Sequence, residues 1–155
     1  MHLFAPFGER LELQREAWVL LQRLQIGTAE LGTLRIEKGH VTGAELDGRV
    51  TLDDAGLGKM ASRKKAFIGD ALRKRPELTR ENRPQLVGIF PKNRSQNFNA
   101  GALLINPGDE AGFGEGWVTA VTHSPALGHW IGLGYISGGH RLWADKPVTC
   151  LLYTS

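Results

Sequence analysis

Two stretches decide the fold: residues 117–122 read Trp-Val-Thr-Ala-Val-Thr, and residues 130–136 read Trp-Ile-Gly-Leu-Gly-Tyr-Ile. Both are short runs of residue types that favour extended backbone. Two similar runs and two turn-rich segments lie around them: 86–90, 102–105, 106–109 (Asn-Pro-Gly-Asp) and 137–139 (Ser-Gly-Gly). Several short strands separated by turns predict a small antiparallel sandwich or barrel in this half of the chain.

The first half of the chain has a helical pattern instead. Apolar residues recur at helical spacing over residues 11–25. A second, shorter helix is predicted from Thr28 as its N-cap, through Leu31 and Leu34, to Gly39 as its stop. An α+β organisation follows, with helices first and strands later.

Between the helices and the strands, residues 40–58 are rich in glycine and aspartate and predict a loop. Within it, residues 51–54 (Thr-Leu-Asp-Asp) have the form of a capping box and predict a single helical turn. A third helix is predicted from Asp70 as its N-cap to Arg75, ended by Pro76. The polar residues 80–84 mark a domain boundary.

Composition limits the function classes. The chain has 155 residues, of which 41% are hydrophobic and 23% charged, as in ordinary globular proteins. No stretch approaches the roughly 20 apolar residues of a spanning helix, and the start lacks a signal-peptide pattern. The single Cys cannot form an internal disulfide. We therefore expect a cytoplasmic protein with no membrane partner.

Positive charge is concentrated in residues 63–65 (Arg-Lys-Lys) and 73–75 (Arg-Lys-Arg), with Arg80 and Arg83 beyond them. Such a cluster could meet phosphates, a polyglutamate tail or an acidic partner surface. A solvated helix face is the more common explanation of a basic run. Aromatic residues do not alternate with these cations, so we expect no nucleic-acid partner.

Arg35 is the candidate binding residue. It lies near the end of the predicted short helix, where Gly39 frees the backbone, and its guanidinium offers a rigid fork of donors. That fork suits a carboxylate or the edge of a heterocycle. On chemistry alone, an ordinary ion pair or a partner for the helix dipole is the simpler explanation.

Two other groups of reactive residue types are weaker candidates. Ser62 and Lys65 lie three residues apart, but no second catalytic motif accompanies them, so a capping role is simpler. His123, His129 and His140 lie in one predicted β region, at spacings that match no standard ligand pattern. We therefore predict no metal site and assign no catalytic residue. No phosphate-binding glycine signature occurs either.

Three groups of segments, in this order, resemble the glycine-cleavage T-protein family. Residues 34–40 (Leu-Arg-Ile-Glu-Lys-Gly-His) and 51–56 (Thr-Leu-Asp-Asp-Ala-Gly) resemble the end of its folate-binding domain. Residues 61–69 (Ala-Ser-Arg-Lys-Lys-Ala-Phe-Ile-Gly) resemble the lysine-rich segment that follows. The segments similar to its carboxy-terminal barrel are 86–88, 116–119 and 124–128. Within the family, residues 35–40 and 124–134 are closest in style to alpha subunits of heterotetrameric sarcosine oxidases.

The resemblance implies that residues 1–80 end a T-protein-type folate-binding domain and that residues 84–149 form a small antiparallel β-barrel. It implies a subunit of a flavoenzyme that oxidises sarcosine to glycine with oxygen and passes the one-carbon unit to tetrahydrofolate. Beta, gamma and delta subunits are the implied partners, and NAD and flavin are implied only for missing parts and partner subunits. Arg35 matches the family arginine that lines the folate cavity. The alternatives are an aminomethyltransferase of the glycine cleavage system and a non-catalytic folate-binding protein of the same fold.

The resemblance also implies that the chain is a truncated piece of a longer protein. Residues 1–26 match the family poorly. Residues 150–155 (Cys-Leu-Leu-Tyr-Thr-Ser) resemble one reading frame of a transposase-type sequencing adaptor. We expect an incomplete barrel, and we expect the chain alone to be inactive and to bind tetrahydrofolate weakly or not at all.

Overall fold

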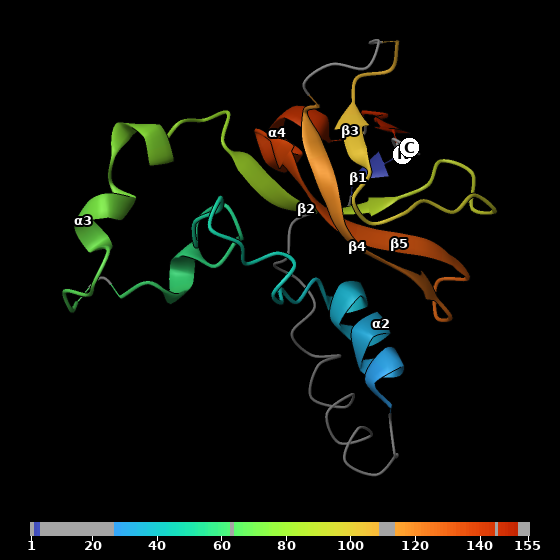
Figure 1. Ribbon diagram of the computed structural model, residues 1–155, viewed down its shortest axis with the longest axis horizontal. Helices are drawn as coiled ribbons and strands as arrows, with labels where there is room; N and C mark the ends of the chain where they lie inside the picture. The colour runs from blue at the N-terminus through green and yellow to red at the C-terminus, as the bar shows by residue number, and fades with distance from the viewer. Residues whose placement is uncertain (1, 4–26, 63, 109–113, 145, 152–155) are drawn as a thin grey trace.

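The computed structural model describes residues 2–3, 27–62, 64–108, 114–144 and 146–151. Its elements, in chain order, are β1 (His2–Leu3), α2 (Thr28–Lys38), η1 (Gly58–Met60), α3 (Asp70–Arg73), η2 (Pro76–Leu78), β2 (Pro84–Phe90), β3 (Leu103–Ile105), β4 (Gly116–Ser124), β5 (His129–Ser137), α4 (Gly139–Trp143) and β6 (Thr149–Leu151) (Figure 1). The helix predicted over residues 11–25 lies outside the described residues. Among the helices that the structure describes, none is long and apolar enough to cross a membrane.

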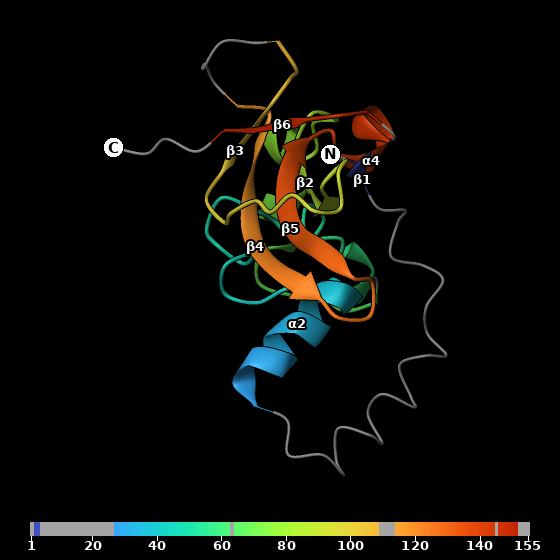
Figure 2. The same cartoon turned by 90° about the vertical axis from the view of Figure 1, so that its right-hand side faces the viewer.

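A six-stranded antiparallel sheet combines β1, from the start of the chain, with five strands of the second half, in the order β1-β2-β5-β4-β3-β6 (Figures 1 and 2). Strands β4 and β5 pair along their whole lengths, from Gly116 opposite Ile136 to Ser124 opposite His129. Strand β2 joins β5 on its other side. The four strands predicted from the sequence are confirmed, and the antiparallel sheet of the predicted barrel-type domain is confirmed with them.

A register shift in β4 decides which side chains face which layer. The irregularity lies between Val118 and Ala120, opposite β5. Because side chains alternate along a strand, the extra residue, Thr119, reverses the alternation beyond it. Val118 and Val121 therefore both belong to one apolar cluster, whereas Ala120 belongs to the cluster on the other face.

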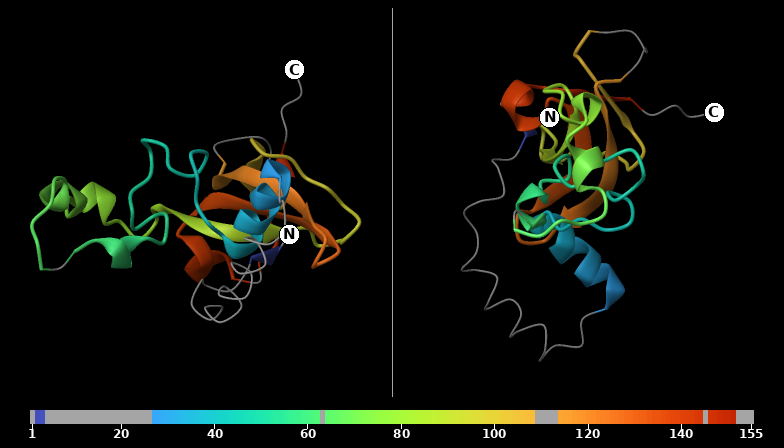
Figure 3. Two further views of the ribbon diagram at one scale, coloured as in Figure 1. Left: turned by 90° about the horizontal axis from the view of Figure 1, so that it is seen from below. Right: turned by 90° about the vertical axis from the view of Figure 1, so that its left-hand side faces the viewer.

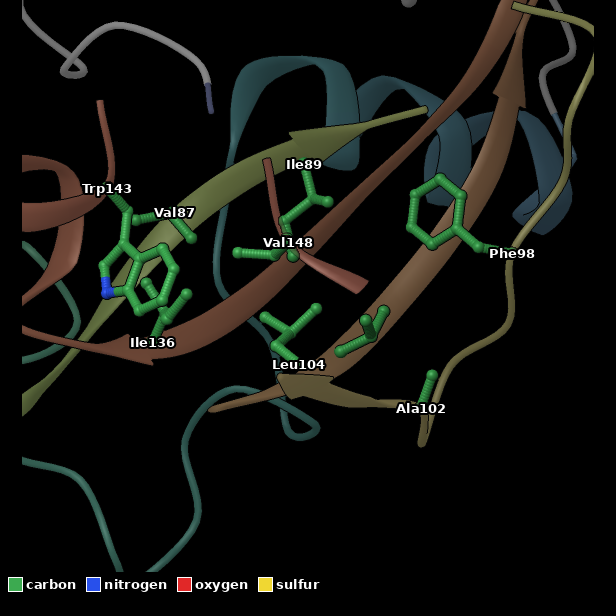
Figure 4. Close-up of a cluster of buried hydrophobic side chains, with 9 residues drawn as sticks. Val87, Ile89, Phe98, Ala102, Leu104, Ile136, Trp143 and Val148 are labelled. Atoms are coloured by element: carbon green, nitrogen blue, oxygen red, sulfur yellow. The ribbon is translucent and has the colours of Figure 1, made fainter. Parts of the chain in front are cut away.

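The larger apolar cluster covers one face of the sheet (Figure 4). Its buried members are Val87, Ile89, Phe98, Ala102, Leu104, Val118, Ile136, Trp143 and Val148. Each large apolar side chain contributes about 1.5–3 kcal/mol when it is fully removed from water, so this cluster is the main stabilising layer. Gly132 is required beneath it, because a Cβ atom there would lie 2.8 Å from the Phe98 ring.

Helix α2 packs against the opposite face at the end of β4 and the start of β5, with Ile36 in a second cluster (Figure 2). The other buried members of that cluster are Ala120, Ile131 and Leu133. Two side-chain hydrogen bonds fix the helix on the sheet: Thr33 bonds to Thr122 at 2.9 Å, and Ser124 donates to Glu37 at 2.6 Å. Together with the loop at Glu45, which contacts Tyr135, the helix covers the second face of β5, and nearly all residues of this strand are buried.

The structure confirms the short helix predicted in the first half of the chain and adjusts its details. Gly39 ends α2 with a left-handed φ of 69°, as a glycine stop requires. Thr28 is the first helical residue rather than the N-cap. Leu31 and Leu34, whose spacing suggested the helix, are 47% and 37% exposed, and Ile36 is the buried residue instead.

Residues 57–83, which we call the arm, extend away from the sheet and carry η1, α3 and η2 (Figures 1 and 3). None of the arm's described residues is buried. The third predicted helix is shorter than expected: Asp70 is its first residue rather than its cap, and it ends at Arg73. Pro76 does not follow the helix directly but opens η2. With no apolar face to bury, a longer helix would be marginal here.

Helix α4 and strand β6 were not predicted. Gly138 and Gly139 do turn the chain, with φ values of 70° and 55°, but the chain then enters α4. In β6, Cys150 pairs with Leu104 and Leu151 with Leu103. The described sheet therefore continues to residue 151, two positions beyond the predicted limit of the barrel.

Candidate functional site

Arg35 lies in the last turn of α2, where the helix meets the loop of residues 40–56. Its Nη1 atom donates to Oε2 of Glu45 at 3.0 Å and to the backbone carbonyl of His40 at 3.3 Å. The side chain is 21% exposed. The guanidinium is thus ion-paired on one side and still reaches the surface, and its partner is a residue that the sequence interpretation did not single out.

Glu45 is fully buried and closes a four-residue turn that begins at Thr42. Thr42 donates to Oε2 of Glu45 twice, from its backbone N–H at 2.8 Å and from its hydroxyl at 3.1 Å. The other oxygen, Oε1, is buried without a hydrogen-bond partner among the described residues. A buried carboxylate needs donors or a counter-charge, and here Oε2 takes two bonds from Thr42 and one from Arg35.

Tyr135 of β5 connects this turn to the sheet. Its hydroxyl donates to the backbone carbonyl of Glu45 at 2.8 Å, and its ring lies 5.3 Å from that of Trp117. Burial raises the pKa of Tyr135 to about 12, and the negative charges of Glu45, Asp54 and Asp47 add to the effect. The phenol therefore stays protonated at neutral pH and remains a hydrogen-bond donor.

A second turn in the same loop repeats the arrangement. Thr51 donates its N–H to Oδ2 of Asp54 at 2.8 Å, and Asp54 returns its N–H to the Thr51 hydroxyl at 3.3 Å. The predicted capping box is confirmed. Asp54 is 4% exposed and pairs with Arg83, whose pKa this bond raises further above its usual value. The backbone N–H of Leu86 in β2 donates to the Asp54 carbonyl at 2.8 Å.

An exposed pair lies between the two turns. Arg49 donates from its backbone N–H and from Nε to the Asp47 carboxylate, each at 2.8 Å, and these bonds lower the pKa of Asp47. The Arg49 guanidinium also lies 4.6 Å from the centre of the Trp117 ring, within cation–π range. The loop is therefore held to the face of the sheet that α2 also covers.

Four described residues of the basic cluster are ion-paired, two of them within the arm and two with Asp53 and Asp54 of the preceding loop. Arg73 binds Asp53 through two bonds of 2.6 Å, which lower the pKa of Asp53. Lys74 bonds to Asp70 at 2.6 Å. An open cavity of about 340 Å³ lies here, lined by Asp53, Gly56, Gly58, Lys59, Ala61 and Arg73. Arg35 is not among its lining residues, so the structure does not bring the two candidate anion-binding features together.

The remaining sequence candidates have local roles in the described residues. The Ser62 hydroxyl accepts bonds from the backbone N–H of Lys64 at 3.2 Å and of Lys65 at 2.9 Å, so it caps a turn. His129 bonds to the carbonyl of Trp130 at 2.8 Å, and the His123 ring meets the Trp130 ring edge-on. No three His, Cys, Asp or Glu side chains of the described part could hold a metal ion together.

Known proteins are similar to this chain over residues 85–147 and also over residues outside that range. Residues 85–147 match the glycine cleavage T-protein C-terminal barrel domain. The chain is 41% identical over 123 residues to sarcosine oxidase subunit alpha of Rhizobium meliloti (strain 1021), covering 77% of this chain and 12% of the relative. It is 39% identical over 144 residues to the same subunit of Corynebacterium sp. (strain U-96), covering 88% of this chain and 15% of the relative. It is 34% identical over 119 residues to a probable aminomethyltransferase of Halobacterium salinarum (strain ATCC 29341 / DSM 671 / R1), covering 74% of this chain and 31% of the relative.

The sheet and the match over it agree: residues 85–147 are similar to the barrel domain of the glycine cleavage T-protein family, and the structure places them largely in an antiparallel sheet. The resemblance to sarcosine oxidase alpha subunits is confirmed as well, at 38–41% identity. The chain spans only 12–15% of the length of those subunits.

Glu45 is the residue of the candidate site that sequence reasoning missed, although a signal for it exists. Residues 42–45 read Thr-Gly-Ala-Glu, a threonine followed three positions later by an acidic residue. This is the same capping-box pattern that identified residues 51–54. A capping pattern predicts the turn but not the burial of its acid, because burial depends on α2 and β5 packing around it.

Proposed function

We propose that this chain forms part of a tetrahydrofolate site in a protein of the sarcosine oxidase alpha-subunit type, with Arg35 facing the folate. The observation that carries the proposal is the state of this side chain. It is 21% exposed and fixed through Nη1, and no hydrogen bond within the described residues uses its Nε or Nη2. A fixed, partly exposed guanidinium suits a carboxylate or the acceptor edge of a heterocycle, and folate has both.

In this proposal, the whole protein oxidises sarcosine to glycine with oxygen, and tetrahydrofolate accepts the one-carbon unit. The residues of this chain bind and orient the folate, and they take no part in the oxidation. Flavin and NAD belong to other parts of the alpha subunit and to its beta, gamma and delta partners, in the cytoplasm. The chain by itself is inactive, since the groups that complete the folate cavity are supplied elsewhere.

An aminomethyltransferase of the glycine cleavage system is the second candidate. The relative of that name favours it, at 34% identity over 119 residues. The sarcosine oxidase alpha subunits match at higher identity, and two of the three also match over a longer part of the chain. We therefore prefer the oxidase, and a measurement of sarcosine-dependent oxygen uptake by the whole protein separates the two functions.

The test uses the assembled enzyme that carries this chain, with sarcosine as substrate. Oxygen uptake reports oxidation, and the ratio of methylene-tetrahydrofolate to free formaldehyde reports one-carbon transfer. We expect Arg35→Ala to retain oxygen uptake but to release formaldehyde, and to bind tetrahydrofolate roughly 10- to 100-fold more weakly, as loss of a charge-assisted bond predicts. Arg75→Ala, which removes an exposed arginine on the arm, is the matched control. Unchanged folate affinity in Arg35→Ala would remove this arginine from the site.

A further inference from the structure

We propose that Glu45 is the positioning residue of the folate site: its buried carboxylate fixes the orientation in which Arg35 presents its guanidinium. This inference rests on the proposed function, because the orientation matters only if Arg35 contacts the folate. Glu45 itself is fully buried and contacts no solvent, so it acts through Arg35 and is not a catalytic residue.

The first argument is the rigidity of the carboxylate. A long arginine side chain samples many rotamers unless a fixed partner holds it. Oε2 of Glu45 is such a partner, because two bonds from Thr42, at 2.8 Å and 3.1 Å, hold the same oxygen that Arg35 meets at 3.0 Å. The guanidinium is therefore held at Nη1, while Nε and Nη2 make no hydrogen bond within the described residues.

The second argument is that the sheet sets the position of this carboxylate. The Tyr135 hydroxyl donates to the backbone carbonyl of Glu45 across ninety residues of sequence, at 2.8 Å. Through Glu45, this bond lets the sheet influence the orientation of Arg35, although Tyr135 does not itself bond to Arg35. A buried ion pair is not in itself stabilising, since desolvation opposes the attraction, so a role in orienting Arg35 gives a reason for its presence.

The chain offers a matched control in Asp54. It is also a buried acid, three residues after a threonine, and it also pairs with an arginine, Arg83. Asp54→Asn removes a buried charge from the same loop, as Glu45→Gln does, but leaves Glu45, the partner of Arg35, unchanged. A purely structural role for Glu45 predicts equal effects of Glu45→Gln and Asp54→Asn on folate binding, whereas positioning predicts different ones.

The test is a double-mutant cycle on the assembled enzyme, with tetrahydrofolate as the titrant. We expect Glu45→Gln to raise the Kd for tetrahydrofolate about tenfold, because a charge-assisted bond becomes a neutral one. In the Arg35→Ala background, the same change should alter the Kd by less than about twofold, since the group that Glu45 positions is absent. Asp54→Asn should lower Tm but leave the Kd within about twofold of wild type.

Thr42→Val keeps the test decisive if Glu45→Gln does not fold. This variant keeps the side-chain volume and removes one of the three donors to Oε2, so we expect a Kd several-fold above wild type. If Glu45→Gln, or Thr42→Val in its place, leaves the Kd unchanged or acts additively with Arg35→Ala, the positioning role is refuted while the folate proposal stands. If the wild-type enzyme binds no tetrahydrofolate, the proposed function fails first.

Discussion

Removal of one hydroxyl, in Tyr135→Phe, tests how the loop of residues 40–56 is held to the sheet. The Tyr135 hydroxyl donates to the Glu45 carbonyl at 2.8 Å, and the Tyr135 side chain is almost completely buried. Phenylalanine keeps the ring beside Trp117 but leaves that carbonyl without this donor. At neutral pH, we expect the variant to lose about 1–3 kcal/mol of unfolding free energy, the usual effect of stranding a buried polar group.

The same hydroxyl makes stability depend on pH in the alkaline range. Burial and neighbouring negative charges raise the pKa of Tyr135 from 10.0 to about 12. The unfolded chain releases this proton near pH 10, whereas the folded chain retains it until about pH 12. The stabilisation is therefore fully present below pH 10 and is lost as the pH rises to about 12. A shift of about two units corresponds to about 2–3 kcal/mol.

Urea denaturation at a series of pH values between about 8 and 11.5 measures both effects, with tryptophan fluorescence as the probe. Trp117 lies 5.3 Å from the Tyr135 ring and reports on this part of the fold. Lysine and arginine titrations affect both proteins alike, so the difference between wild type and Tyr135→Phe isolates the phenol. We expect this difference to shrink as the pH rises above 10. Parallel pH curves for the two proteins would refute the buried hydrogen bond.

Three further predictions concern other parts of the fold. Arg83→Met leaves the carboxylate of Asp54, 4% exposed, without its counter-charge, so we expect urea denaturation to show a loss of about 3–5 kcal/mol; a loss below about 1 kcal/mol would contradict the pair. Gly116→Ala places a Cβ atom 2.8 Å from a Cα atom of β5, so we expect a loss of about 1–3 kcal/mol, whereas Gly48→Ala, which meets open space, should match wild type. Burial raises the pKa of the Cys150 thiol to about 11, so iodoacetamide at neutral pH should label folded protein far more slowly than protein in urea, and equal rates would argue against its burial.

The sheet could be predicted from the sequence because its signal is local. Residues 117–122 and 130–136 carry strand-forming residues bounded by turns, and both strands appear where expected. The register shift at Thr119 could not be predicted, because it depends on how β4 meets β5 rather than on β4 alone. Strand β6 was missed for a similar reason: it is three residues long and is defined by its pairing with β3.

The candidate site was predictable only in part. Arg35 stands out because a helix end and a glycine mark its position, but its partner, Glu45, lies ten residues further on in a loop. Arg83 and Asp54 are twenty-nine residues apart, and nothing local couples them. Burial converts both acids from ordinary turn residues into ion-paired anchors, and burial is a property of the packed fold. Whether Arg35 contacts folate remains a prediction for the binding experiments above.

The turns of residues 42–45 and 51–54 have a consequence for how the protein opens to solvent. Residues 40–56 contain no regular strand or long helix, yet Glu45 and Asp54 are buried and the backbone at these two residues is bonded to β5 and β2. The hydrogen-bonded backbone amides of these two turns should therefore exchange with deuterium only when the sheet itself opens, as one cooperative unit with it. The arm, in which no described residue is buried, should exchange far sooner. Residues 40–56 would then be strongly protected from hydrogen exchange and the neighbouring arm weakly protected. The boundary between the two levels of protection would fall near Leu57.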